Sequence, residues 1–209
     1  MEKYRAPERS VERLCLYRRL LRQMQKEGKN IASSYEIAEK AEVLDSQVRK
    51  DLSLFGQFGI GGKGYDINEL RSKIEQIVGK NRVWRMAVVG AGNLGSALLG
   101  YTQFKKEGFE MVAAFDSDLR KVGKMCSGLL VEDVKDLAKV VKKKKIDIGI
   151  IAVPTHAAQE VANSLIKAGI RAILNLAPCR LRVSENVKVL NVDFCLNIEV
   201  LTHFLMATA

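Results

Sequence analysis

The sequence lacks a long apolar run, and this absence limits where the protein can act. Its longest apolar run, IGIIAVP within Ile146 to Pro154, is far shorter than the ~18 residues that a membrane-spanning helix requires. The N-terminal residues MEKYRAPERS contain no apolar core of the kind found in secretory signals. We therefore expect a cytoplasmic protein that does not bind a membrane.

Cysteine pairs at metal-ligand spacing are also missing. The four cysteines are Cys15, Cys126, Cys179 and Cys195. They form no CxxC pair and have no histidine at a suitable distance in the sequence, so we expect no metal site. Reduced, buried thiols explain them better than a thiol switch does, because a cytoplasmic chain stays in a reducing compartment.

Acidic side chains are in the minority. The chain has 34 Lys and Arg against 24 Asp and Glu, a formal net charge of +10. Most of this positive excess lies in residues 1 to 85, the smaller part of the chain. A basic excess suits a polyanionic partner such as nucleic acid, although it does not identify one.

Residues 1 to about 80 have the pattern of a small helical domain. Apolar residues recur at helical spacing from Val11 to Met24, and Ser33 with Glu36 forms a capping box ahead of a short second helix. A tight turn at 42–44 precedes a third helix, for which Asp45 is the expected N-cap. Two short helices around so short a turn predict a helix-turn-helix.

The third predicted helix has an apolar face and a polar face. Val48, Leu52 and Phe55 lie at i, i+4 and i+7 and form a core stripe. The outward residues are Ser46, Gln47, Lys50 and Ser53, with Arg49 beside them. These side-chain types reach phosphates and base edges in a major groove, so we predict that they contact DNA. A solvated helix face without a partner is the alternative.

A glycine-dense stretch, QFGIGGKGYDI, follows this helix. It predicts a tight β-hairpin of the kind called a wing, which ends at Tyr65. Lys63 and Tyr65 of this stretch complete the predicted DNA-binding set, and an ordinary surface loop is the alternative interpretation.

From Arg85 onward, short apolar runs rich in β-branched residues alternate with segments of helix length. The runs are RMAVVG, EMVAAFD, DIGIIAVP and RAILNLAP. Strands this apolar predict a parallel sheet covered on both faces. Together with the helical pattern of the first 80 residues, they predict an α/β Rossmann fold preceded by a winged helix-turn-helix domain. We expect a DNA-binding domain over 1–80, a Rossmann domain over 81–192 and a C-terminal helix over 193–209.

A glycine motif follows the first of these strands. Its loop consists of Gly90, Ala91, Gly92, Asn93, Leu94 and Gly95. The three glycines permit a turn, close approach of a pyrophosphate and packing of helix against strand. Asp116 ends the second strand, where an acid accepts hydrogen bonds from the adenosine ribose and repels a 2′-phosphate. We therefore predict NADH or NAD⁺ as the cofactor in preference to NADP.

The carboxyl ends of the later strands are expected to add further cofactor contacts, because ligands bind at that edge of such sheets. The residues there are Val153, Pro154, Asn175, Ala177 and Pro178. The two prolines are equally compatible with a simple role in ending the strands.

An enzyme and a regulator are both compatible with a dinucleotide site. A dehydrogenase needs a proton donor or acceptor beside the nicotinamide, and His156 follows a strand end where such a residue could lie. Too little chain remains after Asn175 for a substrate domain. We favour a DNA-binding regulator with no catalytic residue. A small NAD-dependent oxidoreductase with a basic helical appendage and a nucleotide-binding adaptor without a DNA role are the alternatives.

Five strings occur in order along nearly the whole chain: SQVRKDLSLFGQFGIGGKGY, GAGNLGSALLGY, FDSD, AAQEVA and LNLAP. Together they resemble the Rex family of bacterial redox-sensing transcriptional repressors. The resemblance implies a homodimer that binds operator double-stranded DNA when NADH is scarce and releases it when NADH binds. It also implies that Arg49 and Lys50 are the leading DNA contacts.

The same resemblance assigns roles at the subunit interface. It implies that the C-terminal helix swaps into the partner subunit and brings Phe194 near the partner's nicotinamide. It further implies an interface network of Arg13, Tyr101 and Asp193.

The chain departs from the family pattern in two regions. Leu54 replaces the usual aromatic residue, and Ile60–Gly61 replace adjacent basic residues, which leaves Lys63 as the only cation of the wing. Thr155 and His156 replace the small apolar residues that usually follow the VP pair. These departures put DNA contact by the wing, and the surroundings of the cofactor, in doubt.

Overall fold

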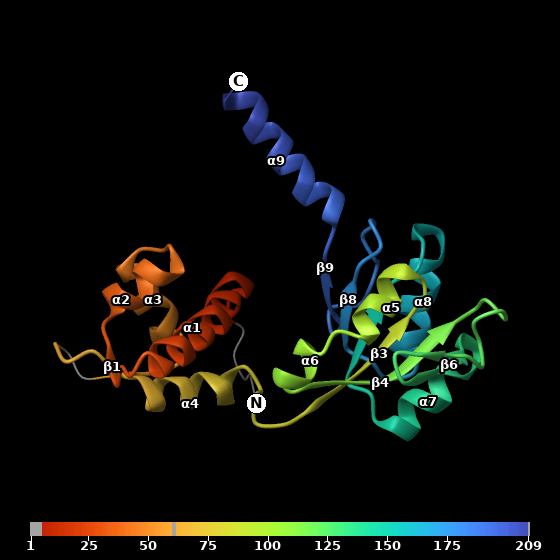
Figure 1. Ribbon diagram of the computed structural model, residues 1–209, viewed down its shortest axis with the longest axis horizontal. Coiled ribbons are helices and arrows are strands. Elements are labelled where there is room, and N and C mark those ends of the chain that lie inside the picture. Colours follow the sequence, from red (N-terminus) through yellow and green to blue (C-terminus); the bar gives the residue numbers. More distant parts are fainter. Residues whose placement is uncertain (1–5, 60–61, 209) are drawn as a thin grey trace. The chain divides into compact units, whose positions relative to one another are not determined.

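The computed structural model describes residues 6–59 and 62–208. It divides the chain into two compact units, the N-terminal unit Met1–Arg82 and the C-terminal unit Val83–Ala209 (Figure 1). Each unit has a hydrophobic core of its own. The finer division into 1–80, 81–192 and 193–209 stays a prediction.

The N-terminal unit is built around its first helix. Its elements are α1 (Glu8–Lys26), β1 (Ile31–Ala32), α2 (Ser34–Ala41), α3 (Asp45–Ser53), β2 (Tyr65–Asp66) and α4 (Ile67–Ile77). α1 buries Leu14, Tyr17, Leu21 and Met24 at helical spacing, because its apolar stripe must leave water. The other three helices pack on α1, and this packing fixes α3 in the unit.

α2 and α3 form the predicted helix-turn-helix. The Ser33 hydroxyl accepts the Glu36 N–H at 3.1 Å and the Glu36 carboxylate accepts the Ser33 N–H at 2.9 Å, so the capping box is confirmed. The prediction that Asp45 caps α3 is wrong. The N-cap is Leu44, and Asp45 is the first helical residue. There its carboxylate interacts favourably with the positive end of the helix dipole and stabilises the helix.

The glycine-rich segment after α3 differs from a simple hairpin in its strand pairing. β2 pairs antiparallel with β1, the strand that precedes α2. The two arms of the loop approach each other closely, since a Cβ on Gly59 would lie 2.5 Å from the Gly64 carbonyl oxygen. Ile60 and Gly61, the predicted departures in the wing, lie outside the described residues. The described part is a narrow glycine loop whose second arm continues into β2.

The C-terminal unit contains a seven-stranded sheet. The strands are β3 (Trp84–Val89), β4 (Phe109–Asp116), β5 (Met125–Cys126), β6 (Leu129–Asp133), β7 (Ile148–Ile151), β8 (Ala172–Asn175) and β9 (Lys188–Asn191). Their order is β5-β6-β4-β3-β7-β8-β9, and every neighbouring pair is parallel except β5 with β6. The strand order reverses at β3, because β4, β6 and β5 lie on one side of it and β7, β8 and β9 on the other. Sheets of this type bind ligands at such a switch point. The predicted Rossmann fold is confirmed.

Helices cover both faces of this sheet. They are α5 (Asn93–Leu99), α6 (Gln103–Lys106), α7 (Leu137–Lys144), which follows a 3-10 turn at Val134–Asp136, and α8 (Thr155–Lys167). Ala87 and Val89 of β3 face α7 and α8, whereas Met86 and Val88 face α5 and α6, which is the alternation expected of a strand. The helix after the glycine motif is interrupted, because α5 ends with Gly100 as its C-cap and α6 begins at Gln103.

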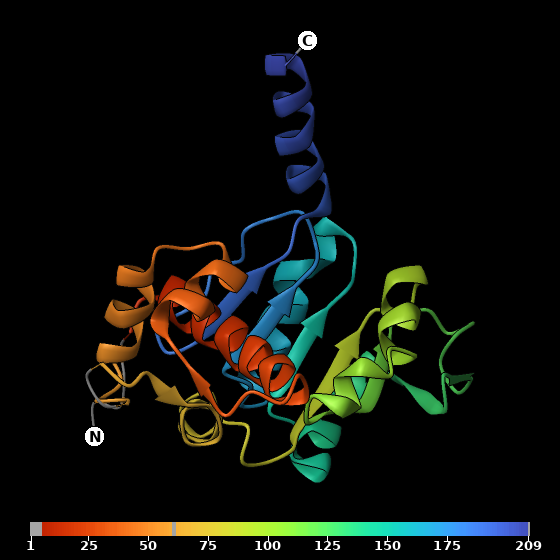
Figure 2. The same cartoon turned by 60° about the vertical axis from the view of Figure 1, so that its left-hand side comes forward.

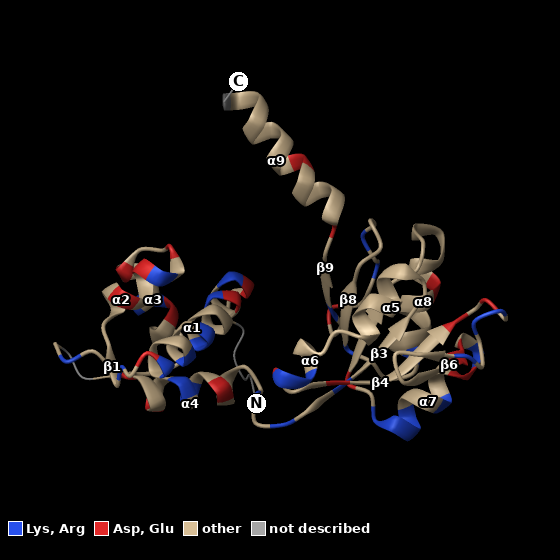
Figure 3. Ribbon diagram, viewed as in Figure 1, with Lys and Arg blue, Asp and Glu red and all other residues tan. Residues whose placement is uncertain are grey.

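The last helix, α9 (Phe194–Thr208), follows β9 and extends away from the sheet of its unit (Figures 1 and 2). Its large apolar side chains are more than half exposed, and they include Phe194, Leu196, Ile198, Val200, Leu201 and Met206. Glu199 is the only Asp, Glu, Lys or Arg in the helix (Figure 3). A helix that is apolar on all sides is ordinarily buried, so α9 presents a surface suited to being covered.

Candidate functional site

The glycine motif forms the turn between β3 and α5. Gly90 has a φ of 104°, and a Cβ there would lie 2.4 Å from the Ala152 carbonyl oxygen. A Cβ on Gly95 would lie 1.8 Å from the Gly90 carbonyl oxygen, whereas one on Gly92 would meet nothing within 4 Å. The fold therefore requires the first and third glycines, and the second leaves open space beside the backbone.

The N-terminus of α5 opens into this space. Its N-cap is Gly92, and no side chain caps the helix. The first N–H groups of a helix have no partner within it, and they form the positive end of the helix dipole. An anionic group such as a pyrophosphate fits this position without a lysine or arginine to hold it.

Asp116 ends β4 next to the glycine turn and is 8% exposed. Its Oδ2 accepts the Ala91 N–H at 2.8 Å and binds Lys121 Nζ at 2.9 Å, and its Oδ1 accepts the Asp118 N–H at 2.9 Å. Burial alone raises the pKa of Asp116, but these hydrogen bonds outweigh burial and the pKa lies below its ordinary value. The carboxylate is therefore ionised and also holds the glycine turn to the end of β4.

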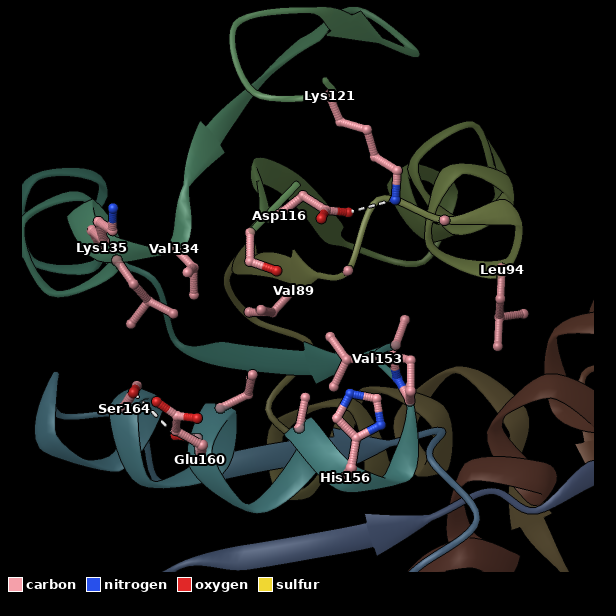
Figure 4. Close-up of a pocket in the computed structure, with 18 of the residues that line it drawn as sticks. Val89, Leu94, Asp116, Lys121, Val134, Lys135, Val153, His156, Glu160 and Ser164 are labelled. Carbon is pink, nitrogen blue, oxygen red and sulfur yellow. Dashed lines mark hydrogen bonds and ion pairs between the residues drawn. The ribbon is translucent and has the colours of Figure 1, made fainter. Parts of the chain in front are cut away.

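A cavity of about 930 Å³ lies beside these groups (Figure 4). Its walls are the glycine turn, the end of β4, the start of α7 and one face of α8. The predicted cofactor residues that line it are Gly90, Gly92, Asn93, Leu94, Asp116, Val153 and Pro154. The structure thus brings together residues from three strand ends at the carboxyl edge of the sheet, where the sequence predicted a dinucleotide site.

Asn175 was predicted to contact the cofactor, but it lies outside the cavity lining. Its side chain is fully buried, and its Nδ2 donates to the carbonyl oxygens of Ala177 at 3.1 Å and Cys179 at 2.8 Å, and to Asn191 Oδ1 at 2.9 Å. Its Oδ1 accepts the Ala177 N–H at 3.1 Å. These bonds fix the turn after β8, so Asn175 holds the backbone at this edge of the sheet in place.

The other predicted cofactor residues also lie outside the cavity lining. Ala91 and Ala177 are buried in the two turns and Gly95 is buried in α5, where they contribute backbone geometry. Pro178 is exposed beside the turn after β8, and Phe194 is 53% exposed at the start of α9. Contacts of these residues with a cofactor stay predictions.

Sequence reasoning considered only His156 from one wall of the cavity and missed the rest of that wall. α8 contributes His156, Glu160, Ser164 and Lys167, which recur at i, i+4, i+8 and i+11 and so share one helix face. Figure 4 shows the His156 ring directed into the cavity from the first turn of the helix. This polar periodicity, in a helix that starts at a strand end, is the signal that could have identified them. Lys121, a basic residue close to Asp116 in the sequence, reaches it from the loop after β4.

In the N-terminal unit, α3 carries the predicted DNA-contacting side chains. Ser46, Arg49, Lys50 and Ser53 are exposed, and Gln47 is half-buried. Arg49 Nη1 binds Asp45 Oδ2 at 2.6 Å in an exposed ion pair that costs little to break. Lys50 makes no ion pair with any described residue, so its ammonium is available to a phosphate.

The two predicted wing residues differ in exposure. Lys63 is exposed, whereas Tyr65 is half-buried against the core of the N-terminal unit. A Cβ on Gly59 would lie 2.7 Å from the Tyr65 ring, and burial raises the pKa of the Tyr65 hydroxyl. Tyr65 therefore supports the loop from inside, and a DNA contact at this position stays a prediction.

The predicted interface network draws on both units. Arg13 of α1 pairs with Asp51 of α3 within its own unit. Tyr101 is 55% exposed, and its ring meets the edge of Phe104 at a centroid distance of 5.0 Å. Asp193 Oδ1 accepts the Leu196 N–H at 3.1 Å at the start of α9. A network that joins Arg13, Tyr101 and Asp193 stays a prediction.

Neither a metal site nor a membrane span is found in the described residues. Across 6–59 and 62–208, no group of three or more His, Cys, Asp or Glu side chains could hold a metal ion. No helix in this part of the chain is both long and apolar enough to cross a membrane.

A winged helix-turn-helix unit followed by a Rossmann unit with a nucleotide-type glycine turn defines a class: transcriptional regulators that respond to a dinucleotide. Comparisons with known proteins refine this class. The family model described as a CoA binding domain matches residues 81–179, and that of a putative DNA-binding protein N-terminus matches residues 5–53.

Whole-length relatives are named redox-sensing transcriptional repressor Rex. The protein of Desulforamulus reducens is 44% identical over 97% of this chain and 96% of its own length, and that of Carboxydothermus hydrogenoformans is 46% identical over 97% of each. The solved structure of RSP in complex with beta-NAD+ and operator DNA is 36% identical, has a TM-score of 0.92 and covers 97% of this chain and 94% of its own. RSP in complex with beta-NADH has a TM-score of 0.86 at 34% identity, with coverage of 97% and 95%. The chain belongs to the Rex family of redox-sensing transcriptional repressors.

Proposed function

We propose that this chain represses transcription as a homodimer that binds operator DNA through the outward face of α3 and releases it when NADH occupies the cavity. The observation that carries this proposal is the open space at Gly92, which lies in front of an uncapped helix N-terminus and near the ionised Asp116. The relative RSP, whose structures include both operator DNA and the two forms of the dinucleotide, supports it.

The residues of the cavity have separable tasks in holding a dinucleotide. The N–H groups at the start of α5 would bind the pyrophosphate, and Asp116 would accept hydrogen bonds from the adenosine ribose. Lys121 already occupies one oxygen of this carboxylate at 2.9 Å, so it competes with the ribose or binds beside it. Val153 and Pro154 would provide an apolar surface between these groups and the nicotinamide.

Discrimination between the two redox forms would come from burial of the nicotinamide. The oxidised ring carries a positive charge that the reduced ring lacks, and an apolar cover penalises burial of the charged form. Phe194, exposed at the start of α9, is the side chain that we assign to this cover in the partner subunit. For DNA release, the dimer must move its two α3 helices away from the spacing of successive major grooves, ~34 Å.

An oxidoreductase is the second candidate, because His156 is directed into the cavity. The whole-length relatives are named repressors, and we propose that this chain likewise catalyses no hydride transfer. The two candidates are separated by incubating the protein with NADH and a panel of carbonyl substrates in the absence of DNA. Steady oxidation of NADH would favour the enzyme, and its absence together with operator binding would favour the repressor.

Duplex binding itself is tested most directly at Lys50. We expect Lys50→Ala to weaken duplex binding and to reduce the salt slope, d log K/d log[salt], by about one unit, because one phosphate contact is lost. Glu39→Ala, an exposed change elsewhere on the helix-turn-helix, is the matched control and should keep the slope. An unchanged salt slope in Lys50→Ala would show that Lys50 does not contact a phosphate.

A further inference from the structure

A buried carboxylate lies on α3 one turn after Gln47, a residue of the predicted DNA-reading face. Asp51 is fully buried. Its Oδ2 accepts hydrogen bonds from Arg13 Nε at 2.5 Å and the Tyr17 hydroxyl at 2.9 Å, and its Oδ1 accepts from Arg13 Nη2 at 2.7 Å and Gln47 Nε2 at 3.0 Å. An ionised carboxylate offers about four lone-pair positions, and these four bonds fill them.

The charge on Asp51 determines which way the Gln47 amide points. Burial raises the pKa of Asp51, but the hydrogen bonds from Arg13 and Tyr17 outweigh burial and the pKa lies below its ordinary value. An ionised carboxylate can only accept hydrogen bonds, so Gln47 must direct its NH2 group toward Asp51. The Oε1 atom and the second N–H of the amide then remain available on the other side.

This orientation matters for reading a base. A side-chain amide recognises adenine in the major groove by accepting from its N6 amino group and donating to N7 at the same time. A freely rotating glutamine presents the reversed order of donor and acceptor as readily, and it loses rotamer freedom on binding. The hydrogen bond to Asp51 removes the reversed orientation before DNA arrives.

We propose that Asp51 is a positioning residue for operator reading, which holds the Gln47 amide in the orientation that an adenine requires. Arg13 and Tyr17 hold the carboxylate from α1, so a core contact between two helices sets the geometry of a base-reading side chain. This inference rests on the proposed function, because it requires that α3 enter a major groove.

A double-mutant cycle tests the role of Asp51. The probes are a duplex that the wild-type protein selects from a randomised library and a scrambled duplex of the same composition. The full-length wild type, Gln47→Ala, Asp51→Asn and the double variant are compared by the ratio of their affinities for the two duplexes. We expect each single change to lower this ratio roughly tenfold, and the double change to lower it no further.

Two controls separate positioning from stability. Leu21→Ala opens a cavity beside α1 without removing a hydrogen bond of Asp51, so it should lower the melting temperature but keep the affinity ratio. Affinity for the scrambled duplex reports contacts to phosphates and should change little in every variant. If Asp51→Asn does not fold, Asp51→Glu displaces the carboxylate by one methylene and replaces it in the cycle.

The outcomes distinguish this inference from the proposed function. If the wild type enriches no duplex from the randomised library, the proposed function is wrong and the role of Asp51 is wrong with it. If the wild type enriches a duplex but the losses from Gln47→Ala and Asp51→Asn add in the double variant, only the positioning role is overturned.

Discussion

At the scale of single residues, the three glycines of the motif have different roles. Gly90 and Gly95 have no room for a Cβ, whereas Gly92 has open space around it. A sequence pattern treats the three positions alike, yet two of them belong to the fold and one to the ligand. Substitution at these positions therefore separates stability from binding.

Gly92→Ala should fold normally and bind NADH poorly. Its φ of −80° suits any residue and its Cβ would meet nothing within 4 Å, but the methyl group would occupy the space in which a pyrophosphate approaches the backbone. We expect NADH affinity to fall by about tenfold or more, measured by the change in nicotinamide fluorescence on binding.

Gly95→Ala is the matched comparison for this prediction. Its Cβ would lie 1.8 Å from the Gly90 carbonyl oxygen, so we expect it to lower the free energy of unfolding by about 2 kcal/mol or more. Equal melting temperatures for the two variants would contradict the division of roles.

At the scale of elements, the contact between α1 and α3 makes stability depend on pH in the acid range. The folded-state pKa of Asp51 lies below its ordinary value of 3.8, through its bonds to Arg13 and Tyr17. A lowered pKa contributes stability that is present above pH 3.8 and is lost as the pH falls through the folded-state value. Glu36, whose pKa is lowered to about 2 by Lys29 and the capping box, acts in the same direction.

Asp51→Asn should therefore be less stable at neutral pH and lose less stability on acidification than the wild type. We expect a loss of about 2 kcal/mol or more at pH 7, since the change breaks a buried, hydrogen-bonded ion pair. Urea unfolding at a series of pH values between 7 and 2 measures it. Asp45→Asn, which removes an exposed ion pair of the same helix, is the control and should have a smaller effect. Parallel pH profiles for Asp51→Asn and the wild type would contradict this account.

The sequence predicted those elements whose patterns are local. The helix-turn-helix follows from the capping box at Ser33 and the core stripe from Val48 to Phe55, and β3, β4, β7 and β8 follow from continuous apolar runs. β5 and β9 are short and largely exposed edge strands without such runs, so only their pairing partners define them. β6 is short as well and mixes apolar with acidic residues.

The candidate site was predictable to a similar extent. The glycine turn and Asp116 follow from spacing along the chain, but the wall formed by α8 depends on which helix face the sheet leaves uncovered. The direction of Asn175 was not predictable, because its partners Cys179 and Asn191 come together only when the turn after β8 packs beside β9. The buried bonds of Asp51 likewise join residues of two helices.

At the scale of the whole molecule, α9 implies assembly. Its exposed apolar side chains lie on a helix with one acidic and no basic residue, and exposure of that surface to water is unfavourable. A second copy of the chain is the partner that we predict, with α9 exchanged between subunits.

Deletion of residues 194–209 should therefore leave both units folded but give a monomer. Sedimentation equilibrium measures the mass, and circular dichroism checks that helix and strand content outside α9 is kept. The single change Leu201→Glu, on the exposed surface of α9, should shift the equilibrium in the same direction without shortening the chain. A dimer that survives both changes would show that α9 does not form the interface.

The proposed function requires that the ligand bound in the cavity determines whether α3 binds DNA. Titration of NADH and NAD⁺ against a fluorescent operator bound to the full-length protein tests this requirement most directly. We predict that NADH releases the duplex at a concentration far below that of NAD⁺, and that Asp116→Ala loses this response while its affinity for the duplex is kept. Equal potency of the two forms, or a duplex that stays bound at saturating NADH, would contradict the account.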